Sequence, residues 1–193
     1  DLSELKLQQV NGKPVIKNFH KDYKAFNNDN SVNVVVEIPA GMSEKWEVSK
    51  SATGALNREF YMGKPRSINY KPYPVNYGII PNTVLPLRVG GDGDPLDALV
   101  LGPSLTQGDV VKVKILGVIR MKDFGENDDK IVAVPLNDSF SKYENLLHFK
   151  NENPKILEEI TNWFENYKGK NVVTFEKLGT VSEAQKLINY TNR

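Results

Sequence analysis

The sequence predicts an α+β fold, in which a small and strongly bent antiparallel sheet or barrel packs against helices. Three observations support this prediction. Short segments rich in β-branched residues dominate the middle of the chain, turn-forming residues separate them, and helical patterns appear only from Ser141 onward. Because strands and helices do not alternate along the chain, a parallel doubly wound sheet is disfavoured.

Chain length and composition limit the class of protein. The 193 residues suit a single domain spanning 1–193, with 1–30 as a peripheral N-terminal arm or hairpin. The 25 Lys and Arg residues nearly balance 24 Asp and Glu residues, so no overall field would draw the protein to nucleic acid or a membrane surface. The absence of cysteine excludes a disulfide, a thiol nucleophile and a thiolate metal site. With no long apolar stretch and no signal-peptide pattern, we expect a soluble, cytoplasmic protein.

The expected strands begin after the polar first 30 residues. The segment 32–38 is β-branched, and 45–50 alternates charged and apolar residues before a glycine breaks the pattern, which indicates a hairpin. Five prolines between Gly63 and Pro86 exclude a regular helix there and favour a long extended excursion, which is often functional. Three further strands are expected at 97–101, 110–120 and 130–134.

Capping signals place the expected helices late in the chain. The pattern at 141–144 is a capping box before a short turn of helix. Asn153 and Pro154 supply a cap residue and a first-turn proline for a longer helix. A strand at 172–175 and a helix opened by a second capping box at 182–185 complete the chain.

The longer helix carries an apolar stripe. Its apolar residues recur three and four positions apart until Gly169 ends the pattern, so this helix should pack on the sheet. The residues of the stripe are Ile156, Leu157, Ile160, Trp163, Phe164 and Tyr167.

Three aspartates, Asp92, Asp94 and Asp97, crowd the start of the expected strand 97–101. Carboxylates this close repel one another unless protons or cations neutralise them, and oxygen ligands without cysteine favour Mg²⁺ or Mn²⁺ over zinc. A solvated acidic turn is the simpler alternative for such a motif alone. An EF-hand fails on spacing, because Leu96 and Pro103 stand at the fifth and twelfth loop positions. An aspartyl-nucleophile phosphatase is a poor match as well, because Leu96 occupies its Thr or Val position.

A second acidic turn follows between two later strands. It contains Asp123, Glu126, Asp128 and Asp129. Alone, this turn would be a solvated hairpin tip, but two acidic turns that converge at one end of a barrel would form a metal site.

A metal site that acts on a phosphoryl group also needs fixed cations to hold the anionic oxygens. Tyr167 ends the apolar helical stripe beside a lysine, while Tyr73 and Tyr77 lie in the proline-rich excursion and could equally be packing residues. Each basic candidate taken singly would be ordinary surface charge. The basic candidates are Lys45, Arg58, Lys130 and Lys168.

These residues belong to a longer series of motifs. The string DGDPLDALV at 92–100 resembles the hallmark of family I soluble inorganic pyrophosphatases. Around it, VVVEIPAG, KWEV, NREF, YPVNYG, KDFGENDDKIVAVP and FENYKGK follow in that family's order and approximate spacing. Several motifs spread over about residues 34–168 make coincidence a poor explanation.

The resemblance implies a highly twisted five-stranded OB-like β-barrel with flanking helices. It implies hydrolysis of pyrophosphate to two orthophosphates with several Mg²⁺ ions, which Mn²⁺ could replace, and Asp94 as acceptor of the proton of the attacking water. Glu47 and Tyr73 are expected around the site rather than in it. The implied metal ligands are Glu37, Asp92, Asp97, Asp123 and Asp128. The implied substrate-binding residues are Lys45, Arg58, Tyr77, Lys130, Tyr167 and Lys168, of which Lys130 also tunes the carboxylates.

Some residues depart from the family's pattern. Phe124 stands where many members carry an acidic or polar residue, and Asn162 and Asn166 replace histidines that bacterial members place at trimer contacts. The segment 61–71 is longer than in the most compact bacterial members of the family and shorter than in the large eukaryotic members. We expect a homo-oligomer, with a hexamer favoured over a dimer.

The alternative class is an OB-like module that binds single-stranded nucleic acid. Such a module needs stacking aromatic residues on a basic groove. The net charge of +1 and the acidic turns speak against it.

Overall fold

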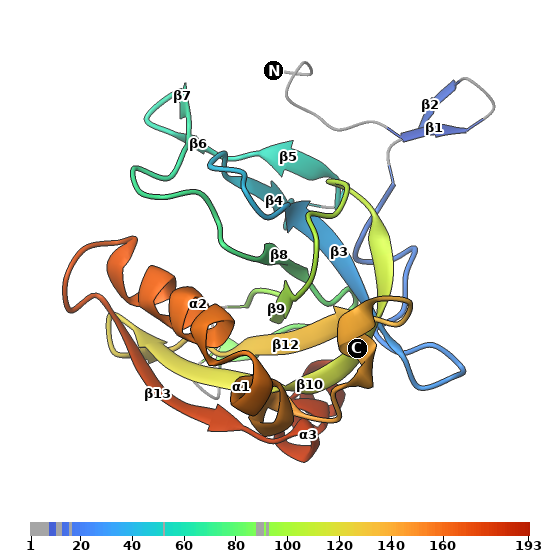
Figure 1. Cartoon of the computed structure of the whole chain (residues 1–193). Helices are drawn as coiled ribbons and strands as arrows, with labels where there is room; N and C mark the ends of the chain where they lie inside the picture. Colours follow the sequence, from blue (N-terminus) through green and yellow to red (C-terminus); the bar gives the residue numbers. More distant parts are fainter. Residues whose placement is uncertain (1–7, 11–12, 16, 52, 88–90, 92) are drawn as a thin grey trace.

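A computed structural model of the chain describes residues 8–10, 13–15, 17–51, 53–87, 91 and 93–193. Its centre is a closed ring of five strands (Figure 1), which pair in the order β3, β8, β9, β12 and β10, with β10 also pairing with β3. The sheet is mixed and not evenly barrel-like, but the predicted α+β fold with a twisted five-stranded OB-like ring and flanking helices is confirmed. The ring strands are β3 (Val32–Ile38), β8 (Asn76–Ile79), β9 (Asp97–Val100), β10 (Val110–Asp123) and β12 (Lys130–Pro135).

The long strand β10 closes the ring. Its first residues pair with β3, its middle pairs with β12, and its last six residues pair with β13 (Val173–Gly179). The register against β12 shifts between Ile115 and Gly117. A Cβ atom at Gly117 would lie 2.5 Å from the carbonyl oxygen of Gly179, so this position requires glycine.

One pair of ring strands corrects the prediction of an antiparallel sheet. β9 and β12 run parallel, with Lys130 opposite Asp97 and Ala133 opposite Val100. Parallel neighbours need a long crossover connection, and here the chain between them supplies β10 and β11. The segments 97–101, 110–120 and 130–134 were therefore predicted correctly as strands, but not the direction of their pairing.

Short hairpins surround the ring. The predicted strand at 32–38 and the hairpin that begins at 45–50 are confirmed, and the described residues between 63 and 86 contain no helix. The hairpin of β1 and β2 lies within the predicted N-terminal arm, and the domain assignment stays a prediction. These elements are β1 (Gln8–Val10), β2 (Lys13–Val15), β4 (Trp46–Val48), β5 (Leu56–Arg58), β6 (Phe60–Tyr61), β7 (Lys64–Pro65) and β11 (Glu126–Asn127).

Two of the helices, α1 and α3, begin at other caps than the sequence predicted. The pattern at 141–144 is not a capping box, because the side chain of Asn145 caps α1 (Leu146–Glu152) and 139–142 form a 3₁₀ turn. Likewise α3 (Val181–Thr191) opens on Thr180, whose side chain and that of Glu183 form the capping box predicted two residues later.

The start of α2 (Pro154–Asn166) was predicted correctly, although its cap works differently. Pro154 occupies the first turn, but the side chain of Asn153 makes no cap hydrogen bond. Its amide donates instead to the Tyr143 hydroxyl at 2.7 Å, which ties α2 to the segment before α1.

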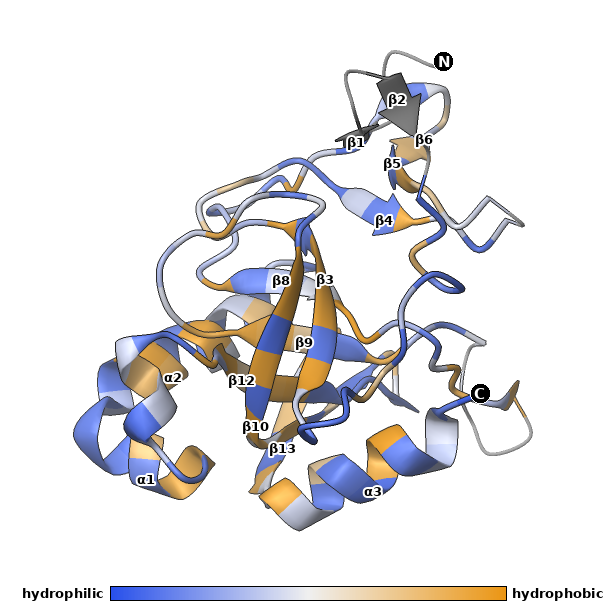
Figure 2. Ribbon diagram, turned by 90° about the vertical axis from the view of Figure 1, so that its right-hand side faces the viewer, coloured by the Kyte–Doolittle hydropathy of each residue, from blue (hydrophilic) through white to orange (hydrophobic). Residues whose placement is uncertain are grey.

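The core lies on both faces of the sheet. Alternate residues such as Leu99 and Ala98 point to opposite faces, one covered by α1 and α2 and the other by α3. Figure 2 shows the ring strands as mostly apolar and α3 as striped. The predicted stripe on α2 is buried at four positions, whereas Ile156 is exposed. No helix among the described residues is long and apolar enough to cross a membrane.

Candidate active site

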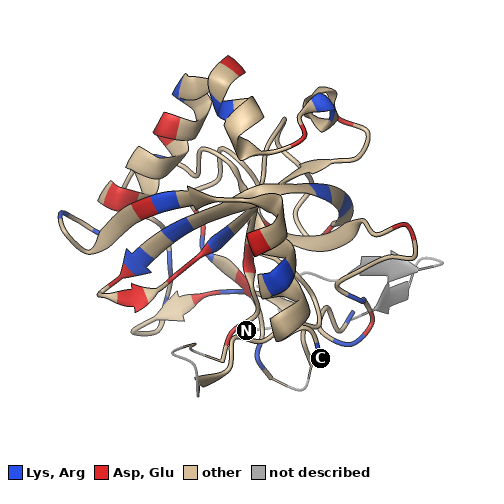
Figure 3. Ribbon diagram, turned by 90° about the horizontal axis from the view of Figure 1, so that it is seen from below, with Lys and Arg blue, Asp and Glu red and all other residues tan. Residues whose placement is uncertain are grey.

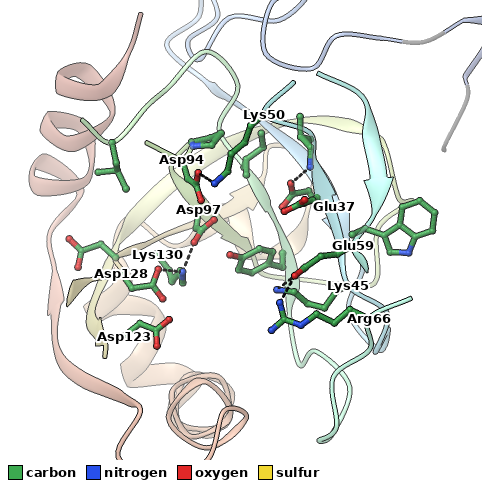
Figure 4. Close-up of a pocket in the computed structure, with 18 of the residues that line it drawn as sticks. Glu37, Lys45, Lys50, Glu59, Arg66, Asp94, Asp97, Asp123, Asp128 and Lys130 are labelled. Carbon is green, nitrogen blue, oxygen red and sulfur yellow. Dashed lines mark hydrogen bonds and ion pairs between the residues drawn. The ribbon is translucent and has the colours of Figure 1, made fainter. Parts of the chain in front are cut away.

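Both acidic turns converge on a cavity of about 260 Å³ at one end of the ring. Asp97 opens β9, Asp123 ends β10, and Asp94 and Asp128 lie in the adjoining loops. The ends of neighbouring strands meet here because the ring curls, so residues about 30 positions apart share one wall (Figure 4). Asp92, the remaining predicted ligand, lies outside the described residues.

Lys130 lies at the centre of this acidic wall. Its Nζ donates to Asp97 and, at 2.6 Å, to Oδ1 of Asp128, and its side chain is 4% exposed. Burial alone would lower the pKa of Lys130, but the two carboxylates outweigh burial and hold this pKa above its ordinary value. Lys130 therefore stays charged and bridges the two acidic turns.

Two more lysines pair with the remaining carboxylates. Lys168 donates to Asp123, and Lys50 forms an ion pair with Asp94. Lys168 follows directly on α2, where Tyr167 stacks on Trp163 with a centroid distance of 4.6 Å. That stacking fixes the end of the helix and so places Lys168.

Glu37 is the buried acid of the site. It is the next-to-last residue of the buried strand β3 and accepts a hydrogen bond of 2.6 Å from the backbone N–H of Val48. Burial raises the pKa of Glu37 to about 8. This contact also ties the β4–β5 hairpin to the ring, so the hairpin forms the second wall of the cavity.

The second wall carries cationic side chains. Figure 4 shows Lys45, Glu59 and Arg66 facing the acidic wall across the cavity. Arg66 donates to Glu59, and the Nζ of Lys45 lies 4.0 Å from the same carboxylate. Lys45 also donates to the Tyr73 hydroxyl at 3.3 Å, and burial lowers the pKa of Lys45.

The predicted tyrosines lie at the base of the cavity. Tyr77 lines it, while Tyr73 is buried behind Tyr77 with ring centroids 5.5 Å apart. Glu47 lines the cavity from β4. Except for Asp92 and Arg58, the structure brings together the residues predicted to touch metal or substrate.

Arg58 lies elsewhere, which corrects the expected geometry. Its guanidinium forms an ion pair of 2.8 Å with Glu44, donates to Ser67 at 3.0 Å and lies over the Trp46 ring. Among the described residues, Arg66 is the arginine that lines the cavity. In this structure Arg58 braces the β4–β5 hairpin and does not line the cavity.

Sequence reasoning missed several lining residues. Arg66 reaches the cavity because β6 and β7 form a tight hairpin, in which Met62 and Gly63 both have positive φ and Arg66 N–H donates to the Glu59 carbonyl at 2.8 Å. A two-residue turn ending in glycine was the available signal. The missed polar residues are Lys50, Glu59, Arg66 and Asn127, while Asp129 lines the cavity as part of the second acidic turn.

The donor set suits a hard divalent cation. The acidic wall offers carboxylate oxygens, and neither histidine lines the cavity. Oδ1 of Asp123 is buried without a hydrogen-bond partner among the described residues. In the part of the chain that the structure describes, no three acidic or imidazole side chains are grouped closely enough to hold an ion. Lysine ammonium groups stand between the carboxylates instead, so a cation would replace them there.

Together, a carboxylate wall, a facing Lys and Arg wall and a five-stranded ring define a site for a cation and an anionic substrate. The sequence model described as inorganic pyrophosphatase matches residues 34–193. The chain belongs to this family, which is one of metal-dependent pyrophosphatases. The resemblance predicted from the sequence is thus confirmed.

Relatives and solved structures agree with this assignment. The inorganic pyrophosphatase of Xylella fastidiosa is 39% identical over 139 residues, which cover 71% of this chain and 72% of the relative. That of Xanthomonas axonopodis pv. citri is 37% identical, covering 81% of this chain and 85% of the relative. The solved structure of inorganic pyrophosphatase from Schistosoma japonicum superposes on this chain with a TM-score of 0.85 at 29% sequence identity. The superposition covers 96% of this chain and 72% of the other. The Helicobacter pylori structure gives a TM-score of 0.73 at 29% identity, over 89% and 96%.

Proposed function

We propose that this protein hydrolyses inorganic pyrophosphate to two orthophosphates in the cavity between the acidic and cationic walls. The observation that carries the proposal is the position of Lys45 and Arg66 opposite the carboxylates, in a chain of the inorganic pyrophosphatase family. The alternative of nucleic-acid binding is not supported by the family match. Figure 3 shows acidic and basic residues interspersed along the strands and helices, whereas a nucleic-acid-binding module needs a basic groove.

The metal proposed for this cavity is Mg²⁺, several ions at a time, with Mn²⁺ as a substitute. Bound Mg²⁺ supplies charge neutralisation of the pyrophosphate and acidifies water. Lys130 keeps Asp97 and Asp128 together at the centre of the acidic wall. The proposed ligands are Glu37, Asp92, Asp97, Asp123 and Asp128.

The chain's own side chains would then bind the substrate and move one proton. Asp94 accepts a proton from the attacking water, whose oxygen bonds to phosphorus while the bond to the bridging oxygen breaks. The ion pair with Lys50 orients the Asp94 carboxylate. Cationic and phenolic groups hold the phosphate oxygens and stabilise charge that develops on the leaving phosphate. The proposed groups are Lys45, Arg66, Tyr77, Lys130, Tyr167 and Lys168, with Glu47 and Tyr73 around them.

Phosphate release from pyrophosphate, measured with Mg²⁺ and with EDTA, tests the activity and the role of Asp94. The Asp94→Asn variant keeps the shape of the side chain but removes the proton acceptor, so turnover should fall by about 10²–10⁴-fold. Full activity of this variant would remove Asp94 from the proposed role. Absence of turnover in the wild-type protein with Mg²⁺ would refute the function itself.

Two arginine variants test the substrate wall. Arg66→Ala should lower kcat/KM by roughly 10-fold to 100-fold, because it deletes a charge-assisted contact to the substrate. Arg58→Ala, its matched control, should lower the melting temperature and leave kcat/KM closer to the wild-type value. The reverse pattern would return the role to Arg58.

We propose a homo-oligomer, a hexamer rather than a dimer, in the cytoplasm. Light scattering after size-exclusion chromatography measures the assembly, and a monomeric mass would refute it.

A further inference from the structure

A second cavity of about 400 Å³ adjoins the proposed active site. Lys50 and Pro95 line both cavities, so the two cavities share part of their walls. The second cavity is built from parts of the chain that are far apart in sequence. They are residues 18, 20 and 21, residues 50 and 51, residues 82–84, the loop at 93 and 95, and Arg193.

The described lining of this cavity is cationic. Lys21, Lys50 and Arg193 contribute three positive side chains, and the described lining residues include no Asp or Glu. Asn18, Ser51 and Asn82 add hydrogen-bonding groups. The arrangement matches what a small oxyanion requires, namely several cations and polar side chains around one cavity.

Backbone contacts fix the positions of these groups. Arg193 N–H donates to the Asn82 carbonyl at 2.9 Å, and the Asn82 amide donates to the Arg193 carbonyl at 2.8 Å. On the opposite side, Oδ1 of Asn18 accepts hydrogen bonds from the backbone N–H groups of His20 and Lys21. The backbone of Lys21 and that of Arg193 are therefore fixed by hydrogen bonds where these residues line the cavity.

His20 reports the local field. Burial lowers the pKa of His20, and the positive charge of Arg193 lowers it further, against a hydrogen bond with the Ser49 backbone. The positive charge of Arg193 therefore acts on a side chain that lines the cavity, which favours an anion there.

We propose that this second cavity binds a phosphate-type oxyanion, orthophosphate in the first place, separately from the active site. At about 30 Å³ for each water in the liquid, the cavity has room for one such ion with part of its hydration shell. Because Lys50 faces both cavities, an anion in the second one attracts the ammonium that pairs with Asp94 in the first. The site itself does not depend on the proposed hydrolysis.

The two histidines of the chain allow a direct test by proton NMR. The full-length protein in EDTA is titrated with inorganic phosphate at constant ionic strength, and the imidazole signals of His20 and His148 are followed against pH. His20 lines the second cavity, while His148 lies on α1 and lines neither cavity. Phosphate should raise the pKa of His20 saturably, by about one pH unit, because a nearby anion stabilises the imidazolium. His148 should not respond.

Variants locate the ion. Lys21→Ala and Arg193→Ala should each weaken phosphate binding at His20 by roughly tenfold, as expected for one charge-assisted hydrogen bond. Lys112→Ala, on β10 and outside both cavities, is the control and should change nothing. Arg66→Ala should also leave the His20 response intact.

Four results would overturn the proposal. The first two are an equal pKa change of both histidines and the lack of a saturable pKa change of His20. The third is an unchanged phosphate affinity in the Lys21→Ala and Arg193→Ala variants. The fourth is loss of the His20 response in Arg66→Ala, which would place the ion in the active site. A response to pyrophosphate without one to orthophosphate would overturn the assignment of the ligand. The experiment contains no turnover, so its failure is separate from failure of the proposed hydrolysis.

Discussion

Replacing Lys130 with methionine tests how the acidic wall is held together before any cation binds. Methionine fills similar space, so the substitution chiefly removes the ammonium that donates to Asp97 and Asp128. Breaking a buried charge pair on one side costs about 3–5 kcal/mol, because the remaining charge is left uncompensated. The Asp97 and Asp128 side chains keep 23% and 28% of their exposure, so solvent offsets part of this cost.

We therefore take the lower end, about 3 kcal/mol, for the loss of stability without metal. In a domain of this length each kcal/mol corresponds to about 2–4 °C, so the melting temperature of Lys130→Met should fall by about 6–12 °C. A divalent cation neutralises the same carboxylates. The difference from wild type should thus narrow when Mg²⁺ is present.

The assay is thermal unfolding followed by circular dichroism, in EDTA and then in excess Mg²⁺. Lys112→Met is the matched control, because its Nζ is exposed and lies 4.0 Å from Asp29, where an ion pair contributes about 0–1 kcal/mol. The reasoning is refuted if Lys130→Met in EDTA melts no lower than this control. It is also refuted if Mg²⁺ leaves the difference unchanged.

The remaining predictions concern stability. The pKa of His20 is lower in the folded protein than its ordinary 6.5, so the free energy of unfolding should fall as the pH drops below 6.5 and should level off below the folded-state pKa. The His20→Gln variant should lose this pH dependence in urea titrations. Phe124 is exposed at φ 48°, so Phe124→Asn should raise stability by about 1 kcal/mol; a lower melting temperature would contradict this. Leu157→Ala should cost about 2–5 kcal/mol, and the exposed Ile156→Ala under about 1 kcal/mol, in the same denaturant assay; equal losses would show that both pack in the core.

The local sequence pattern was sufficient to predict an element where the burial of its residues matches their hydrophobicity. The strand Val32–Ile38 is buried at every position, and its β-branched run indicates a strand on its own. The first turn of α2 was predictable from Pro154. Capping boxes were less reliable, because the pattern of a hydroxyl residue with Glu three positions later occurs at Ser141 without such a cap, while Thr180 forms one with Glu183.

The site was predictable only as far as each residue keeps a fixed place relative to its strand. Asp97, Asp123 and Lys130 begin or end ring strands, so their strand positions place them in the cavity. Arg58 and Arg66 show the limit. Both arginines follow Lys45 in the sequence. Which of them lines the cavity depends on the tight turn at Met62 and Gly63, because this turn folds Arg66 back toward Glu59.

The feature that the sequence analysis got wrong, the parallel pair of β9 and β12, also explains how the acidic wall forms. In the parallel register the first residue of β12, Lys130, lies directly opposite the first residue of β9, Asp97. An antiparallel pairing of the same residues would set Asp97 against Ala133, three residues from Lys130 and about 10 Å away along the strand. The lysine could then not bridge Asp97 and Asp128. The crossover through β10 is therefore what joins the two acidic turns, because β10 ends at Asp123, the first residue of the second turn.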